Sequence, residues 1–397
     1  MMEWPFRPLV VATIALTVGC GACSSLPEGA TPAPPEATYW VYVGAESEDL
    51  VHRLRFGPGG FEVEHTTHIG RLPGETEGPH GLAVSPDGRH LFMTTGHGVP
   101  DGHFWKLEIG PDAPSAEPIL LGRFPATLDI TPDGLYAFVV NFDLHGAMVP
   151  STMSVVYTPR VVEVEQIELC VMPHGVRMHP SGLHAYTVCM MDDQLVEVDT
   201  RTFEVSRRFS VAQGREGPLV TDLAGDRHTG EPGHAGQEPA PMEGSHSATC
   251  SPTWAVPHPD GSRIYVACNV SDEILEVSTD GWELVRRLPS GRGPYNLAVT
   301  GDGRLLVATL KQGDAVEFFA LGSGESLGRN PTSTRVVHGV TISPDDRYAF
   351  VTVEGIGTEP GKVDVFDLAT LERVASAEVG QQASGIDFHR MEAEAGR

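Results

Sequence analysis

The sequence predicts an all-β protein, a seven-bladed β-propeller with four antiparallel strands in each blade. The main observation is a repeated phrase, in which a short apolar run leads to a Pro-Asp-Gly-like corner and a second apolar run follows. The phrase occurs in six altered copies, about 41 to 48 residues apart with one gap of roughly 79, and such a period is typical of propellers and solenoids. Alternating apolar and polar residues favour strands, and this strand pattern favours the propeller over the solenoid. The corners lie at 86–88, 132–134, 180–182, 259–261, 301–303 and 344–346.

Each corner is expected to join the two innermost strands of a blade. Proline fixes φ at the turn, and glycine relieves strain where φ must be positive. Weaker alternating runs follow the second strand and supply the outer strands, most clearly at 194–199, 273–277 and 362–367. Six complete blades follow from the six corners.

The seventh blade is expected to be split between the two ends of the chain. Residues 384–389 read as an inner strand with no second strand after it, and residues 39–44 read as a second strand with no inner strand before it. The N-terminal strands would pair with the C-terminal inner strand, which closes the ring and removes exposed sheet edges. The sequence therefore predicts one propeller domain over 38–391, followed by a short tail at 392–397.

Composition limits the possible partners. The 397 residues include 45 glycines and 32 prolines, as suits many short strands joined by tight turns, and the formal net charge is −26. A chain this acidic repels nucleic acid and anionic lipid, so no nucleic-acid partner is expected. Cationic ligands, metal ions and basic proteins fit better, although the acidity can also serve only to keep the protein soluble and monomeric.

The N-terminus predicts export. Residues 1–19 contain an apolar stretch too short to span a bilayer and read as a signal peptide. The stretch from Leu16 to Cys20 resembles the lipobox of bacterial lipoproteins, which implies a lipid on Cys20, although Thr17 is a poor match and Cys23 is a second possible acceptor. Residues 20–37 suit a flexible tether. We expect a bacterial cell-envelope protein held to the membrane only by this lipid, the alternative being a soluble periplasmic or secreted protein.

Two phrases carry a family resemblance. Residues 138–141 (Phe-Val-Val-Asn) and 264–269 (Ile-Tyr-Val-Ala-Cys-Asn) resemble the Tyr-Val-Thr-Asn repeat of the YVTN β-propeller family. The resemblance covers nearly all of the chain after the tether and implies a seven-bladed propeller that is often secreted or surface-borne. Lactonase-like propellers and the propeller domains of haem- and copper-dependent reductases belong to the wider group, so the resemblance indicates fold more than function.

The copies differ at the residue that opens each inner strand, which we call the slot. The slot residues are His80, Ala126, His174, Thr253, Tyr295, His338 and Ser384. Three histidines at the mouth of the central channel could coordinate one metal ion, because imidazole suits copper, zinc and iron. Each is followed by glycine, which permits close backbone approach. The alternative is that each histidine only makes a strand-entry hydrogen bond within its blade, in a channel too wide for the three to meet.

Four cysteines form two evenly spaced pairs. Cys189 and Cys268 replace the asparagine of the repeat, and Cys170 and Cys250 precede them by 19 and 18 residues. In an oxidising compartment this spacing predicts the disulfides Cys170–Cys189 and Cys250–Cys268. The alternative is a copper-favouring site of sulfur and imidazole, with His174 beside the first pair and His246 beside the second.

Residues 214–250 are expected to form a long insertion, which is usually a functional lid or disordered in a compact domain. The chain has no Cys-x-x-Cys-His motif for covalent haem and no P-loop. The sequence thus favours a scaffold that binds a protein or small ligand, with a copper or other metal site at the channel mouth as an alternative. Lactone hydrolysis is a further alternative, for which Arg177 and Asp129 are the inner-strand candidates.

Overall fold

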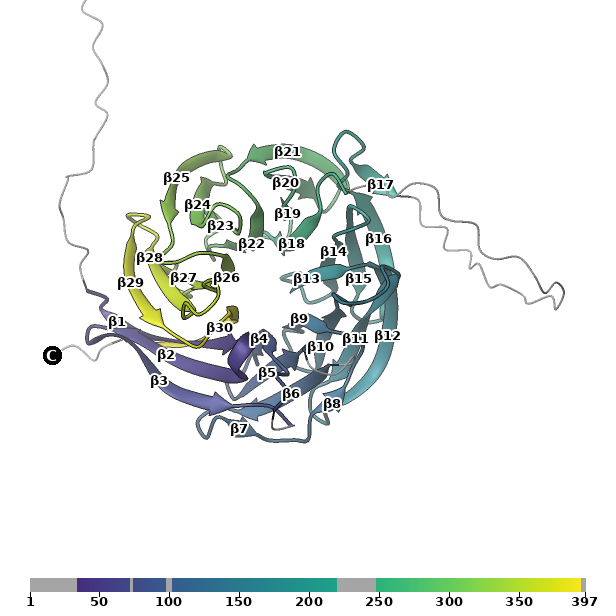
Figure 1. Ribbon diagram of the computed structural model, residues 1–397. Coiled ribbons are helices and arrows are strands. Elements are labelled where there is room, and N and C mark those ends of the chain that lie inside the picture. The colour runs from purple at the N-terminus through teal and green to yellow at the C-terminus, as the bar shows by residue number, and fades with distance from the viewer. Residues whose placement is uncertain (1–33, 72–73, 98–101, 220–247, 394–397) are drawn as a thin grey trace, which may run out of the picture. The chain divides into compact units, whose positions relative to one another are not determined.

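The computed structural model describes residues 34–71, 74–97, 102–219 and 248–393. These residues form seven β-sheets placed around a ring (Figure 1). In six sheets the first strand along the chain lies near the centre and later strands lie toward the rim, whereas in the seventh the C-terminal strand is innermost. The predicted fold class is therefore confirmed. We number the blades from the sheet that begins with β4, and the sheet that joins the two ends of the chain is blade 7.

The first three blades contain the following strands. Blade 1 comprises β4 (Pro79–Val84), β5 (His90–Thr95), β6 (His103–Glu108), β7 (Ala113–Pro114) and β8 (Ile119–Leu120). Blade 2 comprises β9 (Pro125–Ile130), β10 (Tyr136–Asn141), β11 (Pro150–Tyr157) and β12 (Val162–Val171). Blade 3 comprises β13 (Pro173–Met178), β14 (His184–Cys189), β15 (Gln194–Asp199), β16 (Glu204–Ser210) and β17 (Gly217–Leu219).

The next three blades each contain four strands. Blade 4 comprises β18 (Pro252–Pro257), β19 (Arg263–Cys268), β20 (Glu273–Ser278) and β21 (Glu283–Pro289). Blade 5 comprises β22 (Pro294–Val299), β23 (Leu305–Leu310), β24 (Ala315–Ala320) and β25 (Glu325–Pro331). Blade 6 comprises β26 (Val337–Ile342), β27 (Tyr348–Val353), β28 (Lys362–Asp367) and β29 (Arg373–Glu378).

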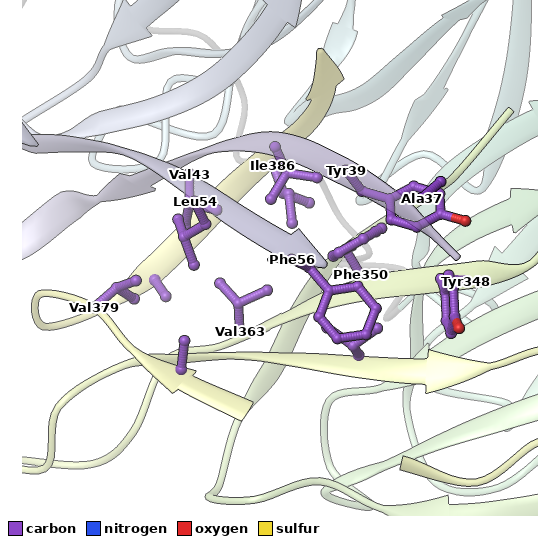
Figure 2. Packing of buried hydrophobic residues seen from close by; sticks show 14 residues of the cluster. Ala37, Tyr39, Val43, Leu54, Phe56, Tyr348, Phe350, Val363, Val379 and Ile386 are labelled. Atoms are coloured by element: carbon purple, nitrogen blue, oxygen red, sulfur yellow. The ribbon is translucent and has the colours of Figure 1, made fainter. Parts of the chain in front are cut away.

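Blade 7 closes the ring as predicted. The C-terminal strand β30 (Ala383–Ala393) is its inner strand and pairs with β1 (Ala37–Ala45), which is followed by the short 3-10 helix η1 (Glu46–Glu48) and by β2 (Leu50–Gly57) and β3 (Gly60–His68). Aromatic side chains of this blade pack on blade 6, where the rings of Phe56 and Tyr348 lie 5.1 Å apart edge to face (Figure 2). The hydrogen bonds between β1 and β30 join the two ends of the chain, and the apolar packing on blade 6 holds the resulting blade in the ring.

The Pro-Asp-Gly corners are held by their own side chains. In blade 1 the Ser85 hydroxyl donates to Asp87 (2.6 Å), and the amide of His90 donates back to the Ser85 oxygen (2.9 Å). Gly88 follows at φ 68°, a conformation that costs other residues more than glycine. The corner is therefore a self-contained turn motif, which explains why its sequence repeats.

At the opposite end of the blades, aspartates fasten one blade to the next. Asp49, Asp193, Asp272 and Asp314 each adopt a left-handed backbone in the turn after a blade's second strand. Their carboxylates accept backbone N–H groups just before the next inner strand, as Asp272 does from Gly293 (2.7 Å) and Asp314 from Val336 (2.8 Å). These bonds fix the start of the four inner strands that follow them, β4, β18, β22 and β26.

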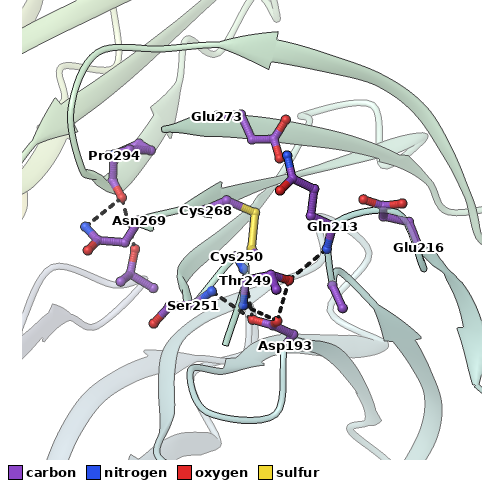
Figure 3. Close-up of a disulfide and its surroundings, with 12 residues drawn as sticks. Asp193, Gln213, Glu216, Thr249, Cys250, Ser251, Cys268, Asn269, Glu273 and Pro294 are labelled. Atoms are coloured by element: carbon purple, nitrogen blue, oxygen red, sulfur yellow. Dashed lines mark hydrogen bonds between the residues drawn. A yellow bond between two sulfur atoms is a disulfide. The ribbon is translucent and has the colours of Figure 1, made fainter. Parts of the chain in front are cut away.

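Both predicted disulfides are present, at this same end of the molecule. Cys170 of β12 is bonded to Cys189 of β14, which joins blades 2 and 3, and Cys250 is bonded to Cys268 of β19. Asp193 lies beside the second disulfide and accepts the amide of Ser251 at 2.8 Å (Figure 3). The four sulfurs are therefore not free to act as thiolate metal ligands. Two disulfides indicate a location outside the reducing cytoplasm.

The predicted insertion at 214–250 begins with structure. Residues 217–219 form β17, which extends the sheet of blade 3 by pairing Ser210 with Gly217. Residues 220–247, with His246, lie outside the described residues, as do the predicted signal peptide at 1–19 and Cys20. None of the helices in the described ranges is long and apolar enough to cross a membrane.

Candidate functional site at the channel mouth

The three slot histidines lie close together. The ring centroids of His80 and His338 are 5.5 Å apart, and those of His80 and His174 are 6.5 Å apart. All three side chains are buried, although they come from blades 1, 3 and 6. The channel is thus narrow enough at its mouth for residues from distant blades to share one site.

Two of the histidines are oriented by the neighbouring blade. The Nδ1 of His80 is 3.1 Å from the carbonyl oxygen of Ala126, and the Nδ1 of His174 is 2.7 Å from that of Thr253. A carbonyl oxygen can only accept, so Nδ1 carries the proton and the lone pair lies on Nε2. The strand-entry hydrogen bond exists, but it crosses between blades instead of staying within one.

The third histidine is held differently. The carbonyl of Ser384, which stands in the equivalent place for His338, accepts the hydroxyl of Thr352 at 2.6 Å. The Nδ1 of His338 is buried and has no hydrogen-bond partner among the described residues. This nitrogen is enclosed by the protein, so the ring nitrogen left for a ligand is Nε2, which lies 4.0 Å from Oε1 of Glu354.

The glycine after each histidine is required by these contacts. A Cβ atom at Gly81 would lie 2.3 Å from the carbonyl oxygen of Ala126, and one at Gly339 would lie 2.9 Å from that of Ser384. Gly175 has a positive φ of 54°, and a Cβ atom there would lie 2.6 Å from the carbonyl oxygen of Thr253. The His-Gly pair thus lets the next blade approach closely enough to orient the ring.

Burial keeps two of the site histidines, His174 and His338, uncharged. It lowers the pKa of His174 to about 3, and it holds the pKa of His338 well below the usual value. Nearby positive charge adds to the effect, since Lys311 disfavours a second cation beside either ring. At neutral pH both imidazoles therefore keep a nitrogen lone pair.

Tyr295 and Lys311 complete the mouth from blade 5. The hydroxyl of Tyr295 lies 3.2 Å from Nε2 of His174, and the ammonium of Lys311 lies 4.3 Å from the Tyr295 ring centroid. Lys311 also forms an ion pair with Glu354 at 2.8 Å. Burial opposes the lysine charge, but Tyr295, Glu354 and Glu46 raise its pKa above the usual value.

A glutamate–histidine pair that the sequence did not predict also lies beside the three slot histidines. Glu46, on η1 of blade 7, hydrogen bonds to His97, whose ring packs edge-on against Phe124. Burial alone would raise the pKa of Glu46, but His80, His97 and Lys311 together hold it below the usual value. The glutamate adds negative charge to the mouth.

The other candidates from the sequence lie further down the channel. Arg177 and Asp129 line one cavity of about 240 Å³, together with Asp387 of β30. Asp129 accepts the amide of Met178 and Asp387 accepts that of Val84, both at 2.7 Å, so each carboxylate also joins its blade to the next. Burial raises the pKa of Asp387 to about 6.

No group of three or more His, Cys, Asp or Glu side chains in the described ranges is already arranged to hold a metal ion. Three imidazoles on one tetrahedral ion, with bonds of about 2.0–2.1 Å, would have ring centroids roughly 5 Å apart. The His80–His338 and His80–His174 ring separations of 5.5 and 6.5 Å are wider. The rings would have to move together, and His174 would have to exchange its Tyr295 contact for the ion.

Comparison with known proteins supports the fold. No family model matches the chain. A curated relative, the seven-bladed β-propeller protein Rv1057 of Mycobacterium tuberculosis, is 29% identical over 125 residues. That match covers 31% of this chain and 31% of the relative, so the chain matches about a third of the relative's length.

Solved structures match over most of the chain at low identity. The periplasmic gluconolactonase PpgL of Pseudomonas aeruginosa is 16% identical with a TM-score of 0.63, covering 89% of this chain and 99% of its own. Hydrazine synthase of Kuenenia stuttgartiensis is 17% identical with a TM-score of 0.58, covering 80% and 92%. At such identities the likeness shows the fold alone. The protein is a seven-bladed β-propeller, and its function has to be argued from its own residues.

Proposed function

We propose that the protein is a ligand-binding propeller of the cell envelope, and that its ligand is a transition metal ion held at the channel mouth by His80, His174 and His338. The proposal does not require an enzymatic reaction. It assigns the three departures from the repeat at the slot to one site, while the rest of the ring serves as a scaffold.

One observation carries the proposal. His80 and His174 donate Nδ1–H to backbone carbonyls of the neighbouring blades, which leaves Nε2 as the coordinating atom. Histidines that bind metals are commonly oriented in this way by a carbonyl or carboxylate on the other ring nitrogen. Nε2 of His338, which lies 4.0 Å from Oε1 of Glu354, supplies a third donor.

Copper is the metal that fits best. The donor set is nitrogen only, because the cysteines are paired in disulfides. Imidazole suits copper, zinc and iron alike, and Cu²⁺ binds such sites most tightly in the usual order of divalent ions. Glu46 and Glu354 add negative charge, which is partly offset by Lys311.

Elemental analysis of the purified protein tests the proposal. We expect close to one equivalent of copper per chain after exposure to Cu²⁺ and removal of the excess. An exposed histidine variant, His65→Ala, should retain the metal, because His65 lies on the outer strand β3. A protein that takes up neither copper nor zinc would overturn the proposal.

The cell-envelope location rests on two features. The disulfides require an oxidising compartment, and the N-terminal sequence resembles a lipoprotein signal ending at Cys20. Lipidation should disappear in Cys20→Ala, with release of the propeller from membranes into the soluble fraction. If Cys20→Ala stays bound to membranes as wild type does, the lipid anchor is wrong. The YVTN resemblance agrees with this placement.

Lactone hydrolysis is the second candidate, favoured by the cavity that Arg177 shares with Asp129 and Asp387. There a carboxylate could direct water to the lactone carbonyl while Arg177 stabilises the developing oxyanion, and cleavage of the ring C–O bond would give a hydroxy acid. Incubation with D-glucono-δ-lactone should then show hydrolysis that is lost in Arg177→Met. Equal rates with and without the protein would remove this candidate.

One serine motif does not contribute to such chemistry. Residues 324–328 (Gly-Glu-Ser-Leu-Gly) fit the pattern of a nucleophile elbow, which requires a sharp turn from a strand into a helix. Here the residues run through the turn into the outermost strand β25, and the Ser326 hydroxyl donates to Glu317 at 2.8 Å. The serine is part of the blade and not a nucleophile.

A further inference from the structure

We propose that the channel holds a second ligand site just below the histidines, and that this site binds a small carboxylate anion through Arg177, Trp254 and Thr127. These residues line a small cavity of about 20 Å³ whose wall also includes His80 and His338. The cavity adjoins the larger one lined by Asp129 and Asp387, and Arg177 lines both.

The first support is a pair of buried polar groups without partners. Trp254 is only 4% exposed, and its indole N–H meets no acceptor within the described residues. Thr127 is 3% exposed, and its hydroxyl is likewise unpartnered there. Buried polar groups are almost always hydrogen-bonded, and an indole N–H can only donate. The cavity therefore requires an occupant that accepts hydrogen bonds.

The second support is the charge of Arg177. Its guanidinium lies 5.0 Å from the Trp254 ring centroid, and its one side-chain hydrogen bond goes to the carbonyl of its own neighbour Val176. No carboxylate of the described residues forms an ion pair with it. Its donors therefore remain available on the same side of the channel as the indole.

A matched pair elsewhere in the fold shows what is missing. Arg207 also stacks on a tryptophan, with its guanidinium 4.3 Å from the Trp282 ring centroid. There the guanidinium is paired with Glu197, and the indole of Trp282 donates to the carbonyl of Arg208 at 3.1 Å. The Arg207–Trp282 pair has a carboxylate and an acceptor supplied by the protein, whereas the Arg177–Trp254 pair lacks both. In the Arg177–Trp254 pair, one oxygen of a ligand carboxylate would accept from the guanidinium, and the other would accept from the indole N–H.

The surroundings favour a monoanion over phosphate. Arg177 also faces the adjoining cavity, which is lined by Asp129 and Asp387, so a doubly charged ligand would meet strong repulsion. Leu82, Leu128 and Ile386 give the chamber an apolar wall suited to a short carbon chain. A planar carboxylate also matches the fork of an arginine.

Titration of metal-free protein with acetate and then lactate tests this site directly. The protein is first treated with a chelator, so that failure of the metal proposal has no bearing on the outcome. We expect one indole ¹H–¹⁵N resonance, the one absent from Trp254→Phe, to shift saturably with acetate but not with equal concentrations of chloride. Inorganic phosphate should compete weakly or not at all.

Variants separate the ligand contact from a general structural effect. Trp254→Phe keeps the ring that Arg177 stacks on but removes the N–H, and should weaken acetate binding at least about tenfold, equivalent to about 1.4 kcal/mol. The matched variant Trp282→Phe should leave the affinity unchanged, and Arg177→Met should abolish binding. If the Trp254 indole resonance does not move with any carboxylate, or if it moves equally with chloride, water fills the chamber and the proposal is wrong.

Discussion

The two ends of each inner strand differ in how closely the copies of the repeat agree in sequence. At the corner end the copies agree, because a Ser or Thr hydroxyl donates to the corner aspartate in blades 1, 2, 5 and 6, at 2.6–2.8 Å. At the mouth end the slot holds five different residue types, and the histidines among them contact one another across the channel. The corner solves a local problem that is the same in every blade, whereas the mouth is one shared space. The slot residues that depart from the repeat are therefore the best candidates for contacts with a ligand.

Removing one mouth histidine is expected to have the largest effect. His174→Ala should weaken copper binding by at least about 100-fold, because loss of even an outer-sphere partner of a metal ligand costs about 10–100-fold. Competition against a chelator of known affinity measures this. Urea unfolding of the metal-free variant gives the control, since a variant that still folds cooperatively but binds copper as tightly as wild type would break the distinction between the two ends.

The disulfides at the mouth end are expected to contribute strongly to stability. Replacing Cys170 and Cys189 together by serine should lower the free energy of unfolding by about 3 kcal/mol, because the bond closes a loop of 19 residues in the unfolded chain. Denaturant unfolding of the double variant tests this. The same change at Cys250 and Cys268 should cost a similar amount, because their separation of 18 residues is nearly equal. A loss below about 1 kcal/mol for both pairs would contradict the assignment.

Asp387 should give the channel a measurable pH dependence. Burial raises the pKa of its carboxyl from 3.8 to about 6, so between these values the folded protein holds a proton that the unfolded chain has released. This contribution to stability is present below pH 4 and is lost as pH rises through 6. The cost of Asp387→Asn should therefore be about 2 kcal/mol smaller at pH 8 than at pH 4, allowing for water in the channel. Equal costs at both pH values would show that the carboxyl titrates normally.

A corner variant should have the smallest effect. Asp133 accepts the Thr131 hydroxyl at 2.6 Å and the Leu135 amide at 3.0 Å, yet it is exposed to solvent. Asp133→Ala should cost about 1 kcal/mol in unfolding free energy and leave copper and acetate affinities unchanged. A change in either affinity would show that the two ends of the strand are coupled.

The sequence was sufficient for features set by local chemistry and by the repeat. The corners, the split blade formed by β30 and β1, and both disulfides were predicted, because each depends on spacing along the chain and on strand pairing. Aligning the copies also located the slot, and the glycine after each slot histidine indicated close backbone approach.

Contacts across the channel could not be predicted. Whether His80 reaches His338 depends on the channel radius, which arises from the packing of all seven blades together. The contact between Tyr295 and His174, the Glu46–His97 pair and the unpartnered Trp254 share this origin. The one available signal was that Tyr295 occupies the same slot as the histidines. The sequence does not distinguish Asp387 as a channel residue, because an aspartate in an inner strand can equally serve to join blades, as Asp387 joins β30 to β4.

X-ray diffraction from copper-loaded crystals, with data collected at the copper absorption edge, tests the central claim most directly. The account predicts one anomalous peak within bonding distance of Nε2 of His80 and His174 and of a ring nitrogen of His338, with the His80–His338 ring separation reduced from 5.5 Å. A channel mouth without a peak, or a copper ion bound only elsewhere on the chain, would contradict it.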